Sequence, residues 1–357
     1  MEAIELLKKY KKRLDISLGK YFDKKIKEAG KSHKLAKEAV KMIADFTLAD
    51  GKRIRPAMLY YAYLANGEKD CNKILEVSQS IELTHTFLLI HDDIIDKDER
   101  RHGTPTIHER YKKIGRRIAP EKDVAHFGNS MAMLAGDMTQ AMANEIIFNS
   151  QFSPQTIVKA LDKLQEIIYH IVPGEMMDVV MEIKGKATEK EILEMYEGKT
   201  SSYSFEGPLH LGTILAGKYD DKMLKNYTQY AMPMGKAFQI RDDILGIFGN
   251  EKKLGKPVGS DIIEGKQTLL VIKALEFGSA EQKNIVKKYL GKEDITKKEL
   301  EAFRAVIKET GSLEYCQKLS EKFIEEALAS LEKINIKNEE AKFFLRGIAE
   351  YMVKREV

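Results

Sequence analysis

The sequence LLIHDDIIDKDERRHGTPT, residues 88–106, places three aspartates directly after an apolar run. On a helix, Asp92 and Asp96 are four residues apart and share one face, with Asp93 turned to the side. A buried carboxylate without a partner is so unfavourable that it normally pairs with a counter-charge or binds a cation. A solvated acidic helix end is the alternative, but the preceding FLLI at residues 87–90 argues for burial. The stretch therefore predicts a helix that presents carboxylates to a cation.

A similar stretch, QIRDDIL, occupies residues 239–245. Gln239 lies one helical turn before Asp242 and Asp243, so its amide can share a face with their carboxylates. A third aspartate would complete the pattern at position 246, but this residue is Gly246. Two acidic helices of this kind can face one cavity, the second with fewer carboxylates than the first.

Aspartate oxygens without histidine or cysteine neighbours suit a hard cation. Magnesium typically keeps several waters and bridges one or two carboxylates to phosphate oxygens, so the two motifs predict a magnesium cluster with a diphosphate as its guest. Basic residues in nearby loops can bind phosphate oxygens, arginine through two parallel hydrogen bonds and lysine as a mobile point charge. These residues are Lys52, Arg53, Arg55, Arg100, Arg101, His102, Lys252, Lys253, Lys256 and Lys266.

The chain as a whole favours helix over strand. It has 357 residues, 43% of them apolar, with only 8 prolines and no tryptophan. Apolar residues recur at helical spacing almost throughout, interrupted by short turns, one of them expected at EGPLHLG, residues 206–212. No low-complexity linker marks a boundary, so we expect a single all-α domain spanning residues 1–357.

Composition disfavours several other classes of protein. The net charge is +4, from 59 basic and 55 acidic residues interspersed along the chain, which is no nucleic-acid signature. Cys71 and Cys316 form neither a disulfide framework nor a zinc motif, and a reducing compartment fits them. The lysine-rich N-terminus lacks the apolar core of a signal peptide, and no apolar run reaches membrane-spanning length. We expect a cytoplasmic protein without an integral membrane segment or a nucleic-acid partner, and surface attachment to a membrane stays open.

Four motifs in order resemble those of the trans-isoprenyl (polyprenyl) diphosphate synthases, most closely the archaeal-type short-chain enzymes. They are G-K-x-x-R at 51–55, D-D-x-x-D at 92–96, K-T at 199–200 and F-Q-x-x-D-D at 238–243. The match runs from about residue 45 to residue 270. The resemblance implies an all-α isoprenoid-synthase bundle around a deep central cavity, and a homodimer.

The resemblance also implies a reaction and the residues for it. The reaction is the head-to-tail condensation of isopentenyl diphosphate with an allylic diphosphate (dimethylallyl, geranyl or farnesyl) after magnesium-assisted ionisation. Up to three magnesium ions, bound with the allylic diphosphate, would be coordinated by Asp92, Asp96 and Asp242, with Asp93 and Asp243 in support. Isopentenyl diphosphate would be held by Lys52, Arg55 and His85. The reacting carbons would be lined by Lys199, Thr200 and Gln239, and a closing loop would contact phosphate through Lys256 and Lys266.

Two departures from the family pattern concern these sites. GEMMD, residues 174–178, has Glu175 where the family usually has glutamine. The family also carries two arginines before the Gly-x-Pro-Thr segment that begins here at Gly103, and an ungapped match pairs Arg101 with the first and His102 with the second. Either His102 replaces an arginine that contacts diphosphate, or the pair has shifted to Arg100 and Arg101. Arg101 belongs to both alternatives.

In the family that the chain resembles, bulky residues four and five positions before the first aspartate limit product length, and here these residues are Leu88 and Phe87. An aromatic residue at the fifth position resembles archaeal synthases that stop at C20 geranylgeranyl diphosphate. A C15 farnesyl diphosphate synthase is the main alternative. A terpene cyclase would not need the isopentenyl site, and a non-catalytic relative would be expected to have lost its aspartates.

Overall fold

The computed structural model describes residues 2–49, 51–101, 103–217, 219–249, 259–292 and 294–354. In these ranges every regular element is a helix, apart from a hairpin of two short strands. The first half of the chain contains α1 (Ala3–Ser32), α2 (Lys34–Leu48), α3 (Ile54–Ala65), α4 (Asn72–Ile95), β1 (Arg100–Arg101), β2 (Thr104–Pro105), α5 (Ile107–Ile118), α6 (Val124–Phe148) and α7 (Pro154–Lys184). The second half contains α8 (Glu189–Tyr196), the π-helix η1 (Glu197–Glu206), α9 (Gly207–Ala216), α10 (Asp221–Phe248), α12 (Ser260–Glu264), α13 (Leu269–Phe277), α14 (Ala280–Tyr289), α15 (Lys297–Glu309), α16 (Ser312–Leu331) and α17 (Glu339–Lys354). The all-α prediction is confirmed.

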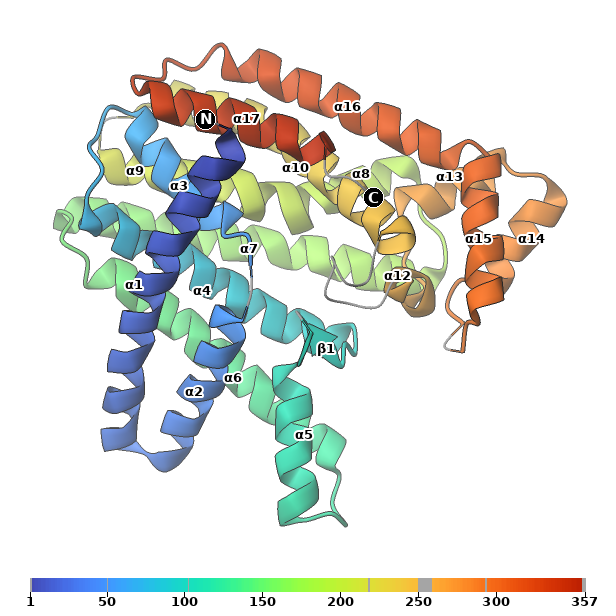
Figure 1. The fold of residues 1–357 in the computed structure, drawn as a ribbon, viewed down its shortest axis with the longest axis horizontal. Coiled ribbons are helices and arrows are strands. Elements are labelled where there is room, and N and C mark those ends of the chain that lie inside the picture. The colour runs from blue at the N-terminus through green and yellow to red at the C-terminus, as the bar shows by residue number, and fades with distance from the viewer. Residues whose placement is uncertain are drawn as a thin grey trace.

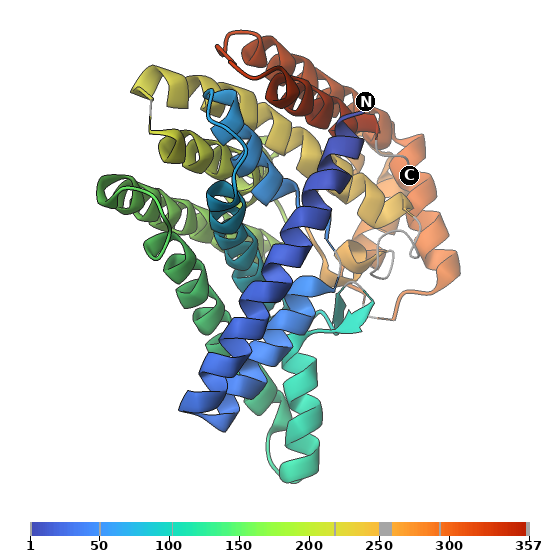
Figure 2. The same cartoon turned by 60° about the vertical axis from the view of Figure 1, so that its left-hand side comes forward.

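The long helices α4, α6, α7 and α10 form the body of the molecule (Figure 1). The helix α4 packs on α6, and the π-helix η1 lies against both α7 and α10. The C-terminal helices α16 and α17 cover α10, while the α1–α2 hairpin and α5 project from one end in both views (Figures 1 and 2). The two acidic stretches are thereby placed on α4 and α10, with η1 contacting the second of these helices.

The helices form because each has an apolar face that needs burial. On α1, Leu14, Leu18 and Phe22 recur every four residues and are at most 1% exposed. The helix α3 is apolar nearly all round and is buried along its whole length. The ring of Tyr61 on α3 stacks on Phe344 of α17 with centroids 3.9 Å apart, so the last helix packs against an early one.

One predicted turn is wrong. Residues 206–212 are helical: Glu206 is the last residue of η1, and α9 begins at Gly207 with Pro208 in its first turn. The chain therefore passes from α8 through η1 into α9 without leaving helical conformation.

Arg53 fixes the segment that precedes α3. Its side chain is buried, with Nε 2.9 Å from Oδ1 of Asp15 on α1 and Nη1 2.5 Å from Oε1 of Glu82 on α4. Its backbone adopts the left-handed conformation, with φ of 56°. Arg53 is thus engaged with two carboxylates inside the protein, and its neighbours Lys52 and Arg55 are held on either side of this anchor.

Candidate active site

The first acidic motif lies at the C-terminal end of α4. The helix ends at Ile95, and the amide of Asp96 donates to the carbonyl of Asp92 over 2.8 Å, which keeps both residues in the last turn. The β1–β2 hairpin turns back at Gly103, where φ is 72°, and returns Arg101 to the motif. The guanidinium of Arg101 pairs with Asp93 and lies 3.3 Å from Oδ2 of Asp92.

Asp93 is the most buried carboxylate of this motif. Its side chain is 1% exposed, and burial raises its pKa to about 7 even though Arg101 opposes the shift. Its Oδ2 atom is buried and has no hydrogen-bond partner among the described residues. Burial, together with the nearby Asp92, also raises the pKa of Asp96. These carboxyl groups are therefore short of positive charge.

Lys199 brings a second cation-bearing segment, η1, to the motif. Its Nζ lies 2.6 Å from Oδ2 of Asp178, 2.9 Å from Oε2 of Glu175 and 3.6 Å from Oδ1 of Asp92. Burial by itself would lower the pKa of Lys199, but Asp92, Asp178 and Glu175 raise it above its ordinary value. Lys199 is thus permanently charged and connects α7 and η1 to the end of α4.

A close approach of two helices sets up this contact. A Cβ on Gly174 would lie 2.4 Å from the backbone nitrogen of Lys199, and a Cβ on Gly198 would lie 3.1 Å from Cα of Gly174. Glycine at position 174 lets α7 and η1 touch backbone to backbone, and glycine at position 198 avoids a further tight contact. Glu175 and Asp178, one and four residues after Gly174, then face the ammonium group of Lys199.

Thr200, which follows Lys199 in η1, contacts the second acidic motif. Oγ1 of Thr200 donates to Oε1 of Gln239 over 2.6 Å, and Nε2 of Gln239 donates to Oδ1 of Asp243 over 2.8 Å. The hydroxyl of Tyr196 donates to the other oxygen of Asp243. Burial raises the pKa of Asp243 to about 8, and neighbouring Asp242 is half-buried on the same helix.

The π-helical turn explains how consecutive residues reach both motifs. The wider turn of η1 is a rare conformation that is frequently found at functional sites. From it, Lys199 contacts Asp92 of the first motif and Thr200 contacts Gln239 of the second. Consecutive residues of η1 therefore contact both motifs.

The segment around α12 closes the site from a further side. Nζ of Lys266 lies 2.8 Å from Oδ2 of Asp96 and 2.9 Å from Oε2 of Glu264. A Cβ on Gly246 would lie 2.5 Å from Oδ2 of Asp261. A side chain at position 246 would therefore displace the carboxylate of Asp261, which already lies beside that position.

Two of the three predicted isopentenyl-binding residues, Arg55 and His85, contact each other. Nη1 of Arg55 lies 3.2 Å from Nε2 of His85, and the hydroxyl of Tyr203 bonds to Nδ1 of the same histidine. The guanidinium carbon of Arg55 is 4.5 Å from the centroid of the Tyr203 ring. Lys52 is exposed, with Nζ 5.8 Å from the ring centroid of Tyr351.

The remaining predicted residues lie apart from these contacts. Arg100 is exposed and donates to the carbonyl of Gly103, so Arg101 is the arginine that reaches the aspartates. Phe87 and Leu88 are half-buried on α4, and the ring of Phe87 meets that of His91 edge-on at 4.8 Å. His102, Lys252, Lys253 and Lys256 lie outside the described residues.

Sequence reasoning missed several residues of the site. Tyr196 and Tyr203 look like ordinary core residues in the sequence, because an aromatic side chain at helical spacing carries no sign of its hydrogen bond. Asp178 had a detectable signal, since it lies three residues after Glu175 and so shares its helix face. The sequence carries no such signal for Asp261, because its position beside Gly246 depends on how α12 packs on α10.

These features define an all-helical protein with two aspartate motifs bridged by lysine, threonine and glutamine. A family model described as polyprenyl synthetase matches residues 36–307. The chain belongs to this family and is a prenyltransferase of the isoprenyl diphosphate synthase type. Among the described residues, no helix is both long and apolar enough to cross a membrane.

Individual relatives agree with this assignment. The chain is 35% identical to the geranylgeranyl diphosphate synthase of Saccharolobus solfataricus over 310 residues, 86% of this chain and 87% of that protein. It is 33% identical to the geranylfarnesyl diphosphate synthase of Aeropyrum pernix over 312 residues, 86% of this chain and 91% of that one. A geranylgeranyl pyrophosphate synthase structure from Corynebacterium glutamicum, complexed with isoprenyl diphosphate and magnesium, superposes with a TM-score of 0.91 at 29% identity, covering 98% of this chain and 99% of that chain.

The raised pKa values predict how stability depends on pH. Burial raises the pKa of Asp93, Glu175 and Glu264 to about 7 and that of Asp243 to about 8. In the unfolded chain such groups titrate near pH 4, so between these values the folded protein holds protons that the unfolded chain has released. The free energy of unfolding of the metal-free protein should therefore fall from about pH 5 to about pH 8.

Thermal unfolding in EDTA across this pH range measures the effect. The Glu264→Gln variant should show a shallower decline, because one of the titrating groups is gone. A Glu299→Gln variant should match the wild-type slope, since Glu299 has a lowered pKa of about 2 and does not titrate in this range. A melting temperature that rises with pH would contradict the assignment.

Proposed function

We propose that this synthase condenses isopentenyl diphosphate head-to-tail with dimethylallyl, geranyl or farnesyl diphosphate, and that its main product is C20 geranylgeranyl diphosphate. The proposal rests on the way η1 connects the two motifs: Lys199 contacts Asp92 of the first motif, and Thr200 contacts Gln239 of the second. Carboxylates and cations interleaved at one place suit a substrate that carries a diphosphate.

The donor set fits magnesium. Asp92, Asp96 and Asp242 offer only oxygen ligands, and buried Oδ2 of Asp93 has no hydrogen-bond partner within the described ranges. In the part of the chain that the structure describes, no three acidic, histidine or cysteine side chains are grouped closely enough to hold an ion alone. Magnesium does not need such a group, because it commonly takes one or two carboxylates together with substrate phosphates and water.

We expect Asp92, Asp96 and Asp242 to hold up to three magnesium ions together with the allylic diphosphate. Bound magnesium would supply Lewis-acid neutralisation of the leaving diphosphate. Arg101, Lys199 and Lys266 would add fixed positive charge, since each already lies against a carboxylate of the first motif. Charge aimed at the place where negative charge develops lowers the barrier to breaking the allylic C–O bond.

The second substrate would be held by Lys52, Arg55 and His85. Arg55 is pre-positioned, because Nε donates to Oγ of Ser204 over 3.1 Å while Nη1 contacts His85. Holding the double bond of isopentenyl diphosphate against the allylic carbon makes carbon–carbon bond formation effectively intramolecular. The proton then lost can pass to the released diphosphate, so no side-chain base is required.

The C20 product is proposed from Phe87. This residue lies on α4 five positions before Asp92, and the ring is held against His91. A bulky side chain there would limit the space for the growing chain. The named relatives include synthases of geranylgeranyl and geranylfarnesyl diphosphate, so the family alone leaves the product length open.

A homodimer is proposed from an exposed apolar face. Along α7, Tyr169, Val172, Met176, Val180 and Ile183 are all exposed and recur at helical spacing. Met133 and Leu134 on α6 are exposed as well. Apolar faces of this extent normally mark a protein interface, and we propose that a second copy of the chain covers this one.

Removal of magnesium or of Asp92 should abolish the reaction. With labelled isopentenyl diphosphate and each allylic primer, EDTA should stop incorporation and excess magnesium should restore it. The Asp92→Ala variant should be slower by about 100- to 1,000-fold, because charge stabilisation of the leaving group is lost. Asp162→Ala, an exposed aspartate on α7, is the matched control and should keep wild-type activity. Undiminished incorporation by Asp92→Ala would overturn the proposal.

Product length should respond to Phe87. The wild-type protein should release C20 geranylgeranyl diphosphate, and Phe87→Ala should shift the product distribution to longer chains because a bulky side chain has been removed. Chromatography of dephosphorylated products measures this. Phe343→Ala on the exposed side of α17 should leave the distribution unchanged. A C15 wild-type product, or an unchanged product from Phe87→Ala, would contradict the role of Phe87.

The quaternary structure can be tested separately. Sedimentation equilibrium should give twice the chain mass of 40.7 kDa. Met176→Asp combined with Ile183→Asp should shift the protein to monomer, because charge cannot be buried unpaired in an apolar interface. Phe343→Asp should remain dimeric. A wild-type monomer would rule out this interface.

A further inference from the structure

One end of the molecule carries a strong excess of positive charge. The second half of α1, the first half of α2 and all of α5 project together at this end (Figures 1 and 2). We call residues 20–41 and 107–118 the basic pole. They contain thirteen basic and four acidic side chains, a net charge of +9. The whole chain carries +4, so the remaining residues together carry −5.

Most of this charge is free to act on a partner. The exposed cations of the basic pole are Lys20, Lys24, Lys27, Lys31, Lys34, Lys37, Lys41, Lys113, Arg116 and Arg117. Among the described residues, Lys24 is the one member of this set within 4.0 Å of a carboxylate, that of Glu28 at 3.8 Å. A fold gains little from unpaired surface lysines, so stability does not account for their concentration at one end.

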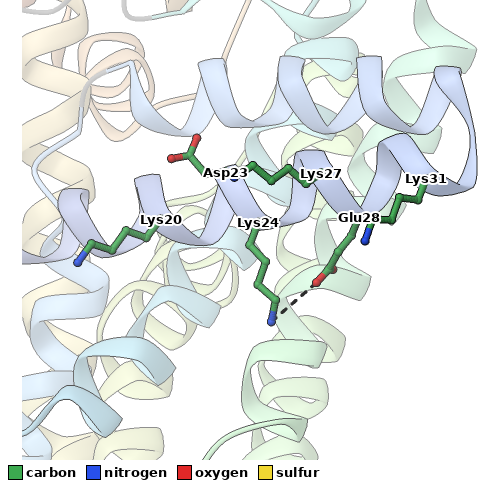
Figure 3. A pocket seen from close by; sticks show the side chains of 6 residues that line it. All are labelled: Lys20, Asp23, Lys24, Lys27, Glu28 and Lys31. Atoms are coloured by element: carbon green, nitrogen blue, oxygen red, sulfur yellow. Dashed lines mark ion pairs between the residues drawn. The ribbon is translucent and has the colours of Figure 1, made fainter.

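The lysines of α1 form a continuous stripe. Lys20, Lys24, Lys27 and Lys31 follow one another at three- and four-residue intervals and line a shallow surface pocket, with Asp23 and Glu28 among them (Figure 3). Two aliphatic side chains are exposed within the basic pole, Leu35 at 57% near the start of α2 and Ile118 at 73% at the end of α5. The surface thus combines many cations with apolar tips.

We propose that the basic pole docks the protein reversibly on a membrane surface that carries anionic phospholipid headgroups. A negatively charged lipid surface attracts clustered lysine and arginine, and their attractions add within a Debye length of the surface. Leu35 and Ile118 would enter the boundary between headgroups and acyl chains, as the apolar face of an interfacial helix does. The proposal rests on charge and exposure and does not depend on the proposed reaction.

A lipid surface fits better than nucleic acid. Binding of single strands normally uses exposed aromatic side chains on which bases stack. The aromatic residues of the basic pole are Tyr21, Phe22 and Tyr111, and all three are buried or half-buried. The exposed apolar side chains are aliphatic, which favours insertion among lipids over stacking on bases.

Docking through the basic pole would not involve the residues of the acidic site. The helix α5 starts two residues after β2, and its 12 residues extend about 18 Å from the hairpin that carries Arg101. No residue of the basic pole belongs to the site described above. Binding to lipid and catalysis can therefore be measured independently.

Co-sedimentation of the purified full chain with vesicles tests the proposal. We expect at least tenfold stronger partitioning onto phosphatidylcholine vesicles containing phosphatidylglycerol than onto pure phosphatidylcholine. Raising the salt from about 50 mM to about 500 mM should remove most of this preference, because the Debye length shortens. Equal binding to both vesicle types, or none to either, would overturn the proposal.

Charge-reversal variants identify the surface. The triple variant Lys27→Glu, Lys31→Glu and Lys34→Glu should bind anionic vesicles about 10- to 100-fold more weakly. The matched control reverses three exposed lysines at the other end, Lys287→Glu, Lys297→Glu and Lys298→Glu, with the same change in net charge, and should bind nearly as wild type. Equal losses in both would mean that net charge alone drives binding, which would refute a specific docking surface.

A second variant tests whether misfolding could explain weaker vesicle binding. Leu35→Ser with Ile118→Ser keeps every charge and should weaken vesicle binding several-fold, while thermal unfolding and magnesium-dependent incorporation in vesicle-free buffer stay unchanged. Wild-type affinity of this variant would remove the apolar part of the proposal. Tighter, salt-sensitive binding to duplex RNA than to anionic vesicles would identify a nucleic-acid surface and overturn the proposal.

Discussion

The structure around the site depends on neutralising carboxylates that are partly or fully withdrawn from water, with side-chain exposures from 1% for Asp93 to 23% for Asp92. Asp92, Asp93 and Asp96 follow one another at the end of α4, where like charges in a low dielectric repel strongly. Their counter-charges come from the adjacent hairpin, through Arg101, and from two segments distant in sequence, through Lys199 of η1 and Lys266 after α12. Charge neutralisation therefore holds together parts of the chain that local helix formation leaves independent.

One buried carboxyl group in each motif is incompletely stabilised in its ionised form. The buried carboxyl groups of Asp93 and Asp243 have pKa values raised to about 7 and about 8, which shows that the ionised forms lack enough stabilisation. A cation that entered with a diphosphate would supply that stabilisation, and Lys199 and Lys266 would then be released toward phosphate oxygens. The same side chains that balance the free protein are thus placed to bind the substrate under the proposed function. Preorganised charge of this kind is the main source of catalytic power in many enzymes.

The sequence predicts the elements better than the contacts between them. The helical fold, the shared face of Asp92 and Asp96 and the link from Gln239 to Asp243 follow from periodicity alone. The π-helical turn at η1 does not, because nothing in YEGKTSSYS distinguishes it from an α-helix until Gly174 and Gly198 bring two backbones together. Gly246 shows the same limit. It looks like a missing carboxylate in the sequence, whereas in space the carboxylate of Asp261 lies against it.

Glu175 departs from the family pattern, and its difference from glutamine depends on pH. Glutamic acid and glutamine have nearly the same shape, so the neutral forms make similar contacts with Lys199. Burial and the nearby Asp92 and Asp178 raise the pKa of Glu175 to about 7, while Lys199 opposes the shift. Below that pH the side chain is neutral and resembles the glutamine of the family. Above it, Lys199 faces three carboxylates. Under the proposed function, these would hold Lys199 more tightly away from phosphate, and the substitution would matter most on the alkaline side of neutrality.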